Sequence, residues 1–290
     1  MSAKQAPPVT RRQIADDIAA LGAKDGEVLY VRCGMQALGI APAEVADVLF
    51  GGIFDAIGPS GTLIGPAFVK TSMRWARDIT VSNRSSPPYT GAFSKALLRQ
   101  PGAVRSTHPT HSFVGIGPQA RAILDHHPND GSCFEPMRQI VERDGLMALI
   151  GCVKASPGFS TVHLAQHDLG LTQQRYTKLF VTVRLEDADG PVFRPIESPG
   201  CSDNFGAFYK DYAEAGNFAS GYVGRAWSIA VRAKGAYAVE RAALERDPRY
   251  PVCDKPECIS CNVMRGYNKR AIPRGLLANL VKRVRQRGGR

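Results

Sequence analysis

An apolar run, an amphipathic helix pattern and a second apolar run follow one another in residues 27–68, EVLYVRCGMQALGIAPAEVADVLFGGIFDAIGPSGTLIGPAF. The first run, Glu27–Arg32, is typical of a short buried strand. Pro42 opens the helix, in which apolar residues recur at spacings of three and four: Val45, Val48, Leu49, Ile53 and Ile57. Gly61 and Thr62 introduce the second run, Leu63–Phe68. Strands that alternate with helices predict an α/β sheet.

The alternation continues on both sides of this stretch. Thr10 and Gln13 have the spacing of a capping box, so a helix is expected from Thr10 to Gly22. Further helices are predicted at 91–100, 118–126, 135–143, 160–170, 203–215 and 236–247, and further strands at 112–117, 146–151, 178–186 and 228–231. Residues 69–90 show no clean period and are expected to form a long functional loop.

The composition is that of a globular protein. Of the 290 residues 44% are hydrophobic, yet no apolar run approaches the roughly 20 residues that a membrane span needs. Met1–Thr10 lacks the apolar core of a signal peptide, so a cytoplasmic location is expected. Seven cysteines, an odd number, argue against a secreted disulfide framework.

The formal net charge of +11 belongs to the C-terminal end of the chain. Residues 262–290 contain nine Lys or Arg and no acid, and removing these nine from the 37 leaves 28 basic against 26 acidic residues. We therefore predict a single domain, residues 1–262, and a basic amphipathic tail, residues 263–290. The apolar residues of the tail are Leu276, Leu277, Leu280, Val281 and Val284. Such a helix either contacts an anionic surface or packs on its own domain.

Signatures of the common α/β enzymes are absent from the sequence. It has no Walker loop, no G-x-S-x-G elbow and no HExxH motif, and Gly115-Ile116-Gly117 is too short for a dinucleotide fingerprint. The most distinctive run is VRSTHPTHS, residues 104–112. Arg105 can bind a phosphate through its planar fork, and Ser106 can add a hydroxyl. The alternative is a polar turn before a strand, with His111 hydrogen-bonded in the core.

Several runs, in the same order, resemble motifs of the aminoglycoside 3-N-acetyltransferase family. VRSTHPTHSFVGIG, residues 104–117, is similar to the family's R-S-x-H-P-x-H-S run. Further similar segments are GTLIGPAF (61–68), SSPPYTGAFSKALLRQPGAVRS (85–106), LIGCVKASPGFSTVHLAQH (149–167), GCSDNFGAF (200–208) and VGRAWSIAVRAKGAYAVERAALERDP (223–248). Together they cover roughly residues 10–261. The resemblance implies a central mixed β-sheet flanked by helices.

The resemblance also implies an acyltransferase with acetyl-CoA as co-substrate, of a family associated with antibiotic resistance. The acetyl group would pass directly to a primary amine of an aminoglycoside, an amino sugar or a similar small molecule, with His163 as general base. A neutral imidazole can take a proton near pH 7. On a helix over 160–170, His163, Gln166 and His167 share one face, so Gln166 or His167 can orient the base.

Other site residues follow from the same resemblance. Contacts to coenzyme A or to the reacting groups are expected from Arg32, Cys33, Gly34, Arg105, Ser106, Thr110, His111 and Ser112. His111 is the second histidine expected in the active site. Tyr89, His167 and Asp168 are expected on the acceptor side.

Three departures from the family pattern bear on activity. Gln166 replaces an acidic residue, and an amide orients imidazole without stabilising imidazolium as a carboxylate does. The run Arg32–Met35 replaces H-S-S-L, which leaves backbone N–H groups to contact the pantetheine arm. Loop 69–90 carries Arg74, Arg77 and Arg84. These cations repel a polycation, so a neutral or anionic acceptor is expected.

Two cysteine features have alternative interpretations. Cys33 follows a predicted strand and a basic residue, as a reactive thiolate would, whereas a free cysteine is more often a small buried residue. Cys253, Cys258 and Cys261 supply three zinc ligands, with Cys201 or a histidine as the missing fourth. The irregular spacing favours free thiols, so no metal is expected.

Rival functions stay open from the sequence alone. One is an acyltransferase with a different acyl donor or amine acceptor in glycan or secondary-metabolite biosynthesis. Another is a catalytically degenerate coenzyme A-binding protein of the same fold, which Gln166 and the lost H-S-S run motivate. A third is an adaptor that binds a membrane or nucleic acid through the basic tail. The oligomeric state, a homodimer included, is also open.

Overall fold

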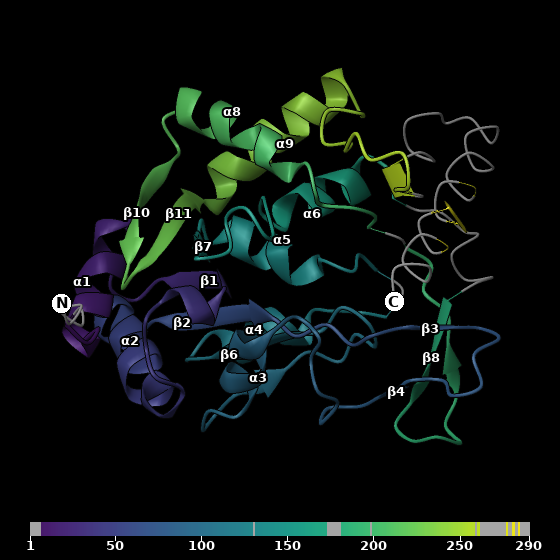
Figure 1. Cartoon of the computed structure of the whole chain (residues 1–290), viewed down its shortest axis with the longest axis horizontal. Coiled ribbons are helices and arrows are strands. Elements are labelled where there is room, and N and C mark those ends of the chain that lie inside the picture. The colour runs from purple at the N-terminus through teal and green to yellow at the C-terminus, as the bar shows by residue number, and fades with distance from the viewer. Residues whose placement is uncertain are drawn as a thin grey trace.

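The computed structural model describes residues 7–129, 131–172, 181–197, 199–258 and 260–261, together with positions 277, 280, 281 and 284. A seven-stranded sheet in the order β10-β11-β7-β1-β2-β6-β5 forms its centre (Figure 1). The strands are β1 (Val28–Cys33), β2 (Thr62–Pro66), β5 (Val104–Arg105), β6 (Phe113–Ile116), β7 (Leu146–Ile150), β10 (Ala219–Val223) and β11 (Ala226–Arg232). β1 runs parallel to both β2 and β7, and the outer strands pair antiparallel. The predicted mixed α/β sheet is confirmed.

Both faces of the central strands are buried, and successive residues alternate between two cores. In β1, Leu29 and Val31 belong to one core, whereas Val28 and Tyr30 belong to the other. The first core includes apolar residues of α1 (Arg11–Ala20), α2 (Gly52–Ile57) and α3 (Ala92–Leu98). The second includes those of α4 (Ala120–Asp125), α5 (Glu135–Glu142), α6 (Thr161–Asp168), α8 (Phe208–Glu214) and α9 (Ala233–Arg246). Figure 1 shows α6, α8 and α9 on one side of the sheet and α2 and α3 on the other.

Helix α1 begins as predicted, because the Thr10 hydroxyl accepts a hydrogen bond from the Gln13 N–H over 3.1 Å. The single helix expected from Pro42 is instead a 3-10 turn (Pro42–Glu44), a π-helical segment (Val45–Gly51) and α2. Gly52 lies so close to α1 that a Cβ atom there would come within 2.7 Å of Arg11 O and Ile14 Cβ. A glycine is therefore required where the two helices cross.

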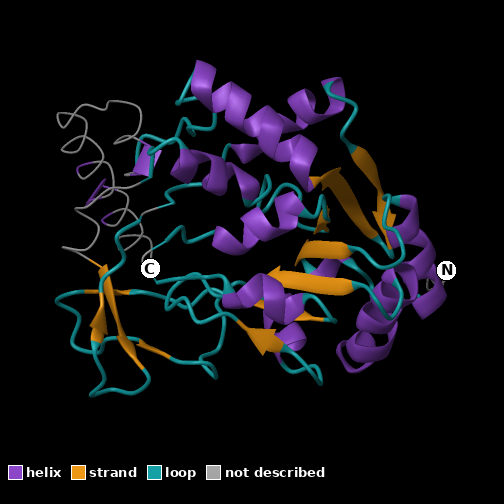
Figure 2. Cartoon of the chain, turned by 180° about the vertical axis from the view of Figure 1, so that it is seen from behind, coloured by secondary structure: helices purple, strands orange, loops and turns teal. Residues whose placement is uncertain are grey.

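Loop 69–90 contributes strands that the sequence does not predict. β3 (Ser72–Met73) and β4 (Val81–Ser82) both pair with β8 (Val181–Leu185), which also pairs with β9 (Val192–Phe193). Figure 2 shows this small sheet at the opposite end of the molecule from α1. A strand of two residues is too short to show a hydrophobic period in the sequence. It is recognised only by the hydrogen bonds to its partner strand.

The C-terminal tail predicted at 263–290 lies largely outside the described residues. Its four described positions, Leu277, Leu280, Val281 and Val284, are helical and exposed. Among the described residues, no helix is long and apolar enough to cross a membrane.

Candidate active site

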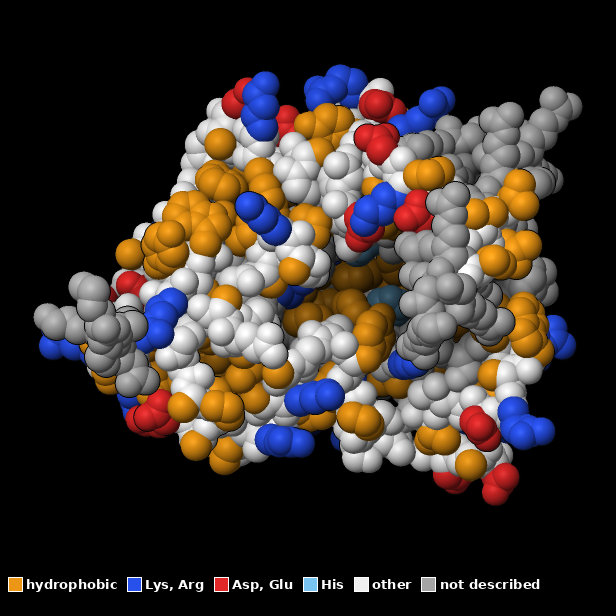
Figure 3. Space-filling model, in the orientation of Figure 1, with side chains coloured by type: hydrophobic (Ala, Val, Ile, Leu, Met, Phe, Trp, Pro, Cys, Tyr) orange, Lys and Arg blue, Asp and Glu red, His pale blue; other side chains and the backbone are white. Residues whose placement is uncertain are grey.

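A cavity of about 430 Å³ opens at the carboxyl ends of the parallel strands. Its wall includes Arg32 and Cys33 at the end of β1, Pro66 at the end of β2 and Cys152 just after β7. Open α/β sheets bind ligands at these strand ends. Figure 3 shows the hollow in the middle of one face, with hydrophobic and histidine side chains inside it.

His163 lines this cavity from α6 and is held between two aromatic rings. Its ring stacks on Phe134 at a centroid distance of 4.6 Å and lies 4.7 Å from Phe205. Its Nδ1 lies 3.1 Å from Gln166 Oε1, three residues along the helix. An amide oxygen only accepts hydrogen bonds, so Nδ1 carries the proton and Nε2 keeps its lone pair. The structure thus brings His163 and Gln166 together as their spacing predicts.

Burial controls the charge of His163. The side chain is 7% exposed, and burial lowers its pKa to about 4, against a smaller raising effect of the Gln166 hydrogen bond. The imidazole is therefore neutral near pH 7, as a proton acceptor has to be.

The first turn of α6 is anchored by contacts that the sequence does not reveal. Ser160 does not cap the helix with its side chain; its hydroxyl lies 2.8 Å from the hydroxyl of Tyr30, and both residues line the cavity. The Thr161 hydroxyl donates to Glu240 on α9 over 2.8 Å, and Tyr212 donates to the same oxygen over 2.5 Å. Complete burial raises the pKa of Glu240 to about 8, so this carboxyl is mostly protonated at pH 7.

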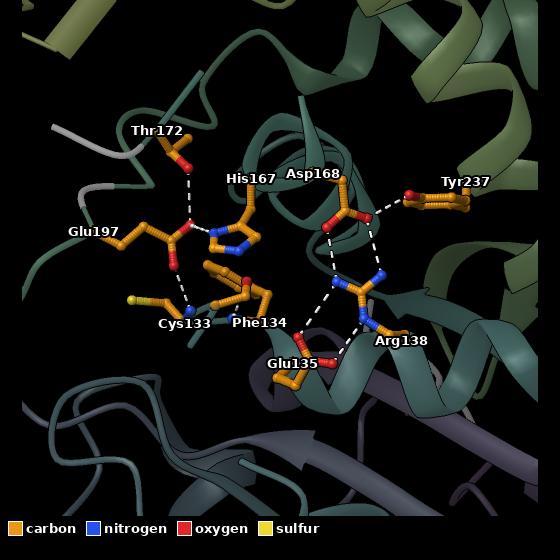
Figure 4. A network of polar contacts seen from close by, with 10 residues as sticks. Cys133, Phe134, Glu135, Arg138, His167, Asp168, Thr172, Glu197 and Tyr237 are labelled. Carbon is orange, nitrogen blue, oxygen red and sulfur yellow. Dashed lines mark hydrogen bonds and ion pairs between the residues drawn. The ribbon is translucent and has the colours of Figure 1, made fainter. Parts of the chain in front are cut away.

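His167 and Asp168, both expected to contact the acceptor, face a polar network instead of the cavity (Figure 4). Asp168 accepts two hydrogen bonds from Arg138, at 2.7 and 3.0 Å, and one from Tyr237 at 2.5 Å. Because these contacts engage both carboxylate oxygens, Asp168 positions α6 against α5 and α9. The structure does not support its assignment to the acceptor side.

His167 lies beside a buried carboxylate. Its Nδ1 is 3.3 Å from Glu197 Oε1, which raises the pKa of His167. Burial alone would raise the pKa of Glu197, but contacts with His167, the Cys133 N–H and the Thr172 hydroxyl lower it. His167 therefore orients toward Glu197 and does not hold the ring of His163.

Residues 104–112 do not line the main cavity, and most of their polar side chains make hydrogen bonds within the protein. Arg105 donates through Nε to Ser112 and through both Nη atoms to the carbonyls of Ala67, Arg84 and Ser86, over 2.5–3.2 Å. Burial lowers its pKa to about 10. These acceptors engage four of its five N–H groups, and contact of Arg105 with a phosphate of coenzyme A stays a prediction.

The hydroxyl residues of this run are also engaged by the protein. Ser106 accepts from the Phe113 N–H and contacts His127, and Ser112 donates to Ala67 O. Ser106 and Ser112 line a second hollow of about 650 Å³. Thr110 and His111 contact each other over 2.8 Å between Oγ1 and Nδ1.

His111 lies behind the cavity wall and is not among the residues that line it. Its ring is 4.8 Å from Phe68 and 5.6 Å from Phe134 by centroid. Burial lowers its pKa to about 4. His111 is partly buried and hydrogen-bonded, close to the alternative interpretation of this run as a polar turn.

Of the three coenzyme contacts expected at the end of β1, two line the cavity and one does not. Arg32 and Cys33 line the cavity, and Arg32 donates to the carbonyls of Gly158 and Ser156 over 2.7 and 3.0 Å. Burial raises the pKa of Cys33 far above its usual value, so Cys33 is a thiol rather than a reactive thiolate. The N–H of Gly34 is engaged with Ile150 O over 2.8 Å and is not free for a pantetheine arm. Tyr89 lines the cavity and is 58% exposed.

Four residues around the site were missed by the sequence analysis: Phe134, Phe205, Glu197 and Glu240. Glutamates in ordinary sequence surroundings give no sign of burial, and the two phenylalanines are indistinguishable from core residues. Phe205 and Glu240 lie within segments that resemble the family and Glu197 lies next to one, whereas Phe134 lies in none of them.

Sequence comparison relates this chain to known proteins. The sequence model of the aminoglycoside 3-N-acetyltransferase family matches residues 30–245. Aminoglycoside N(3)-acetyltransferase IX of Micromonospora chalcea is 32% identical over 193 residues, which cover 60% of this chain and 66% of that protein. The match thus spans just under two thirds of that relative.

Solved structures share the fold. The apoenzyme of aminoglycoside acetyltransferase AAC(3)-IVa aligns with a TM-score of 0.75 and 24% identity, covering 91% of this chain and 99% of that one. AAC-IIIb, solved as a binary complex with CoASH, aligns with a TM-score of 0.64 and 23% identity, covering 83% and 97%. The matched family segment contains the whole cavity wall from Tyr30 to Phe205. The chain therefore belongs to the aminoglycoside 3-N-acetyltransferase family.

Proposed function

We propose that this protein transfers an acetyl group from acetyl-CoA directly to a primary amine of an amino sugar or aminoglycoside-like acceptor. The observation that carries the proposal is the pairing of His163 Nδ1 with Gln166 Oε1 on the wall of a cavity at the strand ends. A solved structure of the same fold with CoASH adds support, because it shows that this fold can hold the coenzyme.

The proposed role of His163 is general base. The amine nitrogen attacks the thioester carbonyl carbon, and His163 Nε2 takes the proton that the nitrogen loses. The bond between carbonyl carbon and sulfur then breaks, the sulfur leaves with the electron pair, and it takes the proton from the His163 imidazolium. Amide, free thiol and neutral imidazole are the end products, so the step needs no further reactant.

Gln166 suits a base that stays neutral between turnovers. Its carbonyl holds the Nδ1–H tautomer and aims the ring, while burial between Phe134 and Phe205 disfavours imidazolium. A carboxylate would stabilise imidazolium during the reaction, and an amide does so less. We infer a slower transfer than the same site would support with a carboxylate.

The charges of the cavity wall and of loop 69–90, which contributes Tyr89 to that wall, favour an acceptor with few cationic groups. Among the described residues that line the cavity there is no Asp or Glu, and Arg32 is the only residue with a full charge at pH 7. Arg74, Arg77 and Arg84 on loop 69–90 are exposed. A polycationic acceptor would meet repulsion that a monoamine sugar would not.

Gln166 also motivates the second candidate, a coenzyme A-binding protein of the same fold without turnover. Transfer of another acyl group, or to another amine, is the third. Release of free thiol from acetyl-CoA and longer acyl-CoAs, measured across a panel of amino sugars, aminoglycosides and simple amines, separates these functions. Thiol release that depends on both substrates supports the proposal. Thermal stabilisation by coenzyme A without release under any pairing would support the binding protein and overturn the enzyme.

A further inference from the structure

We propose that Cys201, Cys253, Cys258 and Cys261 bind a structural Zn²⁺ ion. Their four sulfur atoms all lie within 4.8 Å of one another. Zinc in a tetrahedral site binds thiolates at about 2.3 Å, which places the sulfurs about 3.8 Å apart. Cys201 Sγ and Cys253 Sγ are already 3.9 Å apart. Movements of 1 Å or less per sulfur would complete the tetrahedron.

The fourth ligand comes from a distant part of the chain. Cys253, Cys258 and Cys261 lie on one short segment, and the fold brings Cys201 to them across 52 residues of sequence. Spacing alone shows three ligands, which is one too few for a structural zinc site. The expectation of free thiols rested on the irregular spacing, and the tertiary structure brings Cys201, one of the two fourth ligands that the sequence offered, to the other three.

Backbone N–H groups point at three of the sulfurs. Asp203 N–H donates to Cys201 Sγ at 3.3 Å, Cys253 N–H to Cys261 Sγ at 3.4 Å, and Cys261 N–H to Cys258 Sγ at 3.5 Å. Such donors stabilise thiolates, and outer hydrogen bonds of this kind orient the ligands of metal sites. Lys255 and Asp203 form an ion pair over 2.6 Å beside this site, which would carry a net charge of about −2.

Packing leaves this cluster separate from the two main cores. Its buried members are Val252, Cys253 and Cys261, with Cys201 and Cys258 partly buried against them. One valine and four cysteine side chains bury too little apolar surface to order two chain segments by themselves. A metal ion would supply that stability, because its binding free energy adds to the free energy of folding.

The ligand set and the sulfur separations favour Zn²⁺ over Mg²⁺, Ca²⁺ or disulfide bonds. Four thiolates are too soft a ligand set for Mg²⁺ or Ca²⁺. A disulfide is shorter than the observed separation of Cys201 and Cys253, since a bonded pair lies about 2.05 Å apart. If the four cysteines formed two disulfides, no thiolate would remain to accept the hydrogen bonds that the backbone N–H groups donate.

The ion would support the wall of the cavity. Ser202, next to Cys201, lines the cavity, and Phe205 packs against His163 at 4.7 Å. Asn204 donates to Val252 O at 3.3 Å, which ties the same two segments together. Zinc would therefore hold residues 201–205 in place as a positioning element, without touching the reacting groups.

Elemental analysis of the full chain, purified without chelator, tests the site directly. We expect about one zinc per chain after gel filtration. Release of that zinc to a chromogenic chelator should require modification of the thiols, and its loss should lower the Tm by roughly 5 °C or more. Cobalt substitution should produce thiolate-to-metal charge transfer and the visible bands of tetrahedral coordination.

Variants locate the ligands. Cys258→Ser and Cys201→Ser should each lose the zinc, whereas Cys133→Ala, which removes a buried thiol from the main core, should keep it. If both serine variants fail to fold, the metal content and cobalt spectrum of the wild-type chain still decide the proposal. A folded wild-type protein without zinc, with iron in its place, or with a disulfide among the four cysteines overturns it. None of these measurements depends on acetyl transfer.

Discussion

Gln166 Oε1 accepts a hydrogen bond from His163 Nδ1 over 3.1 Å, one turn apart on α6. The bond fixes the imidazole tautomer with Nε2 as its proton acceptor. Burial of the pair then keeps the ring neutral at pH 7. Geometry and charge thus both suit the proposed role of His163 as a neutral base on the cavity wall.

Removing the imidazole should abolish most turnover. We expect His163→Ala to lower kcat by about 10² to 10⁴, since that is the usual contribution of a general base. Coenzyme A affinity, measured by calorimetry, should change little. His126→Ala is the matched control, because His126 is exposed on the surface beside α4. Nearly full activity of His163→Ala with a confirmed acceptor would contradict the mechanism.

Placing a carboxylate behind the base should shift its titration. Gln166→Glu puts a negative charge next to Nδ1–H, which favours imidazolium and raises the pKa of His163 from about 4. The limb of the pH–rate profile where the base loses its proton should therefore move to higher pH. Turnover above that limb should stay equal or increase.

Gln166→Ala provides the comparison for this shift. It removes the tautomer-holding oxygen without adding charge, so turnover should fall while the limb does not move upward. A limb that stays fixed in Gln166→Glu would show that residue 166 does not act on His163 through charge.

Glu240 should make the folded protein less stable as the pH rises. Its pKa is about 8 in the folded protein and near 4.5 when unfolded, so the folded state binds the proton more tightly. The stabilisation is complete below about pH 4.5 and is lost as the pH rises through 8. Glu240→Gln should remove this dependence.

Urea unfolding between pH 5 and 8 measures the difference. The free energy of unfolding of the wild type should fall relative to Glu240→Gln with a slope approaching 1.4 kcal/mol per pH unit, the value for one proton. Glu245→Gln, on the exposed side of the same helix, should keep the wild-type slope. Parallel curves for all three proteins would show that Glu240 is ionised in the folded state.

Arg105 should matter for stability more than for coenzyme affinity. Arg105→Ala removes charge-assisted bonds to the carbonyls of Ala67 and Ser86, and we expect the free energy of unfolding to fall by about 2–3 kcal/mol. Arg99→Ala, at an exposed position, should change it by less than about 0.5 kcal/mol. Unchanged stability with a tenfold higher KM for acetyl-CoA would support the phosphate role instead.

Charge on loop 69–90 should discriminate among acceptors. The double variant Arg74→Glu/Arg77→Glu should lower the KM for a polycationic aminoglycoside by about tenfold at low salt, or roughly 1.4 kcal/mol. The difference should shrink as salt screens it, and the KM for a monoamine sugar should hardly change. The double variant Arg99→Glu/Arg121→Glu, at exposed positions outside the loop, serves as the charge-matched control. Equal effects on both acceptors would remove electrostatics as the cause.

The sequence by itself determined the α/β class, the buried strands and the capped start of α1, because each depends on residues within a few positions of one another. The His163–Gln166 contact belongs to the same group, since a spacing of three on a helix places two side chains on one face. The family resemblance then located the helix that carries His163, the proposed base, and the family match confirms that resemblance.

Only the tertiary structure decided how the remaining polar residues are used. Arg105 looks like a phosphate ligand in its run, but three distant carbonyls occupy its donors. Glu197 and Glu240 are buried by elements far away in sequence, and Cys201 meets the cysteine cluster only through the fold. Long-range packing brings these groups together, and no local pattern encodes which partners a side chain will meet once water is excluded.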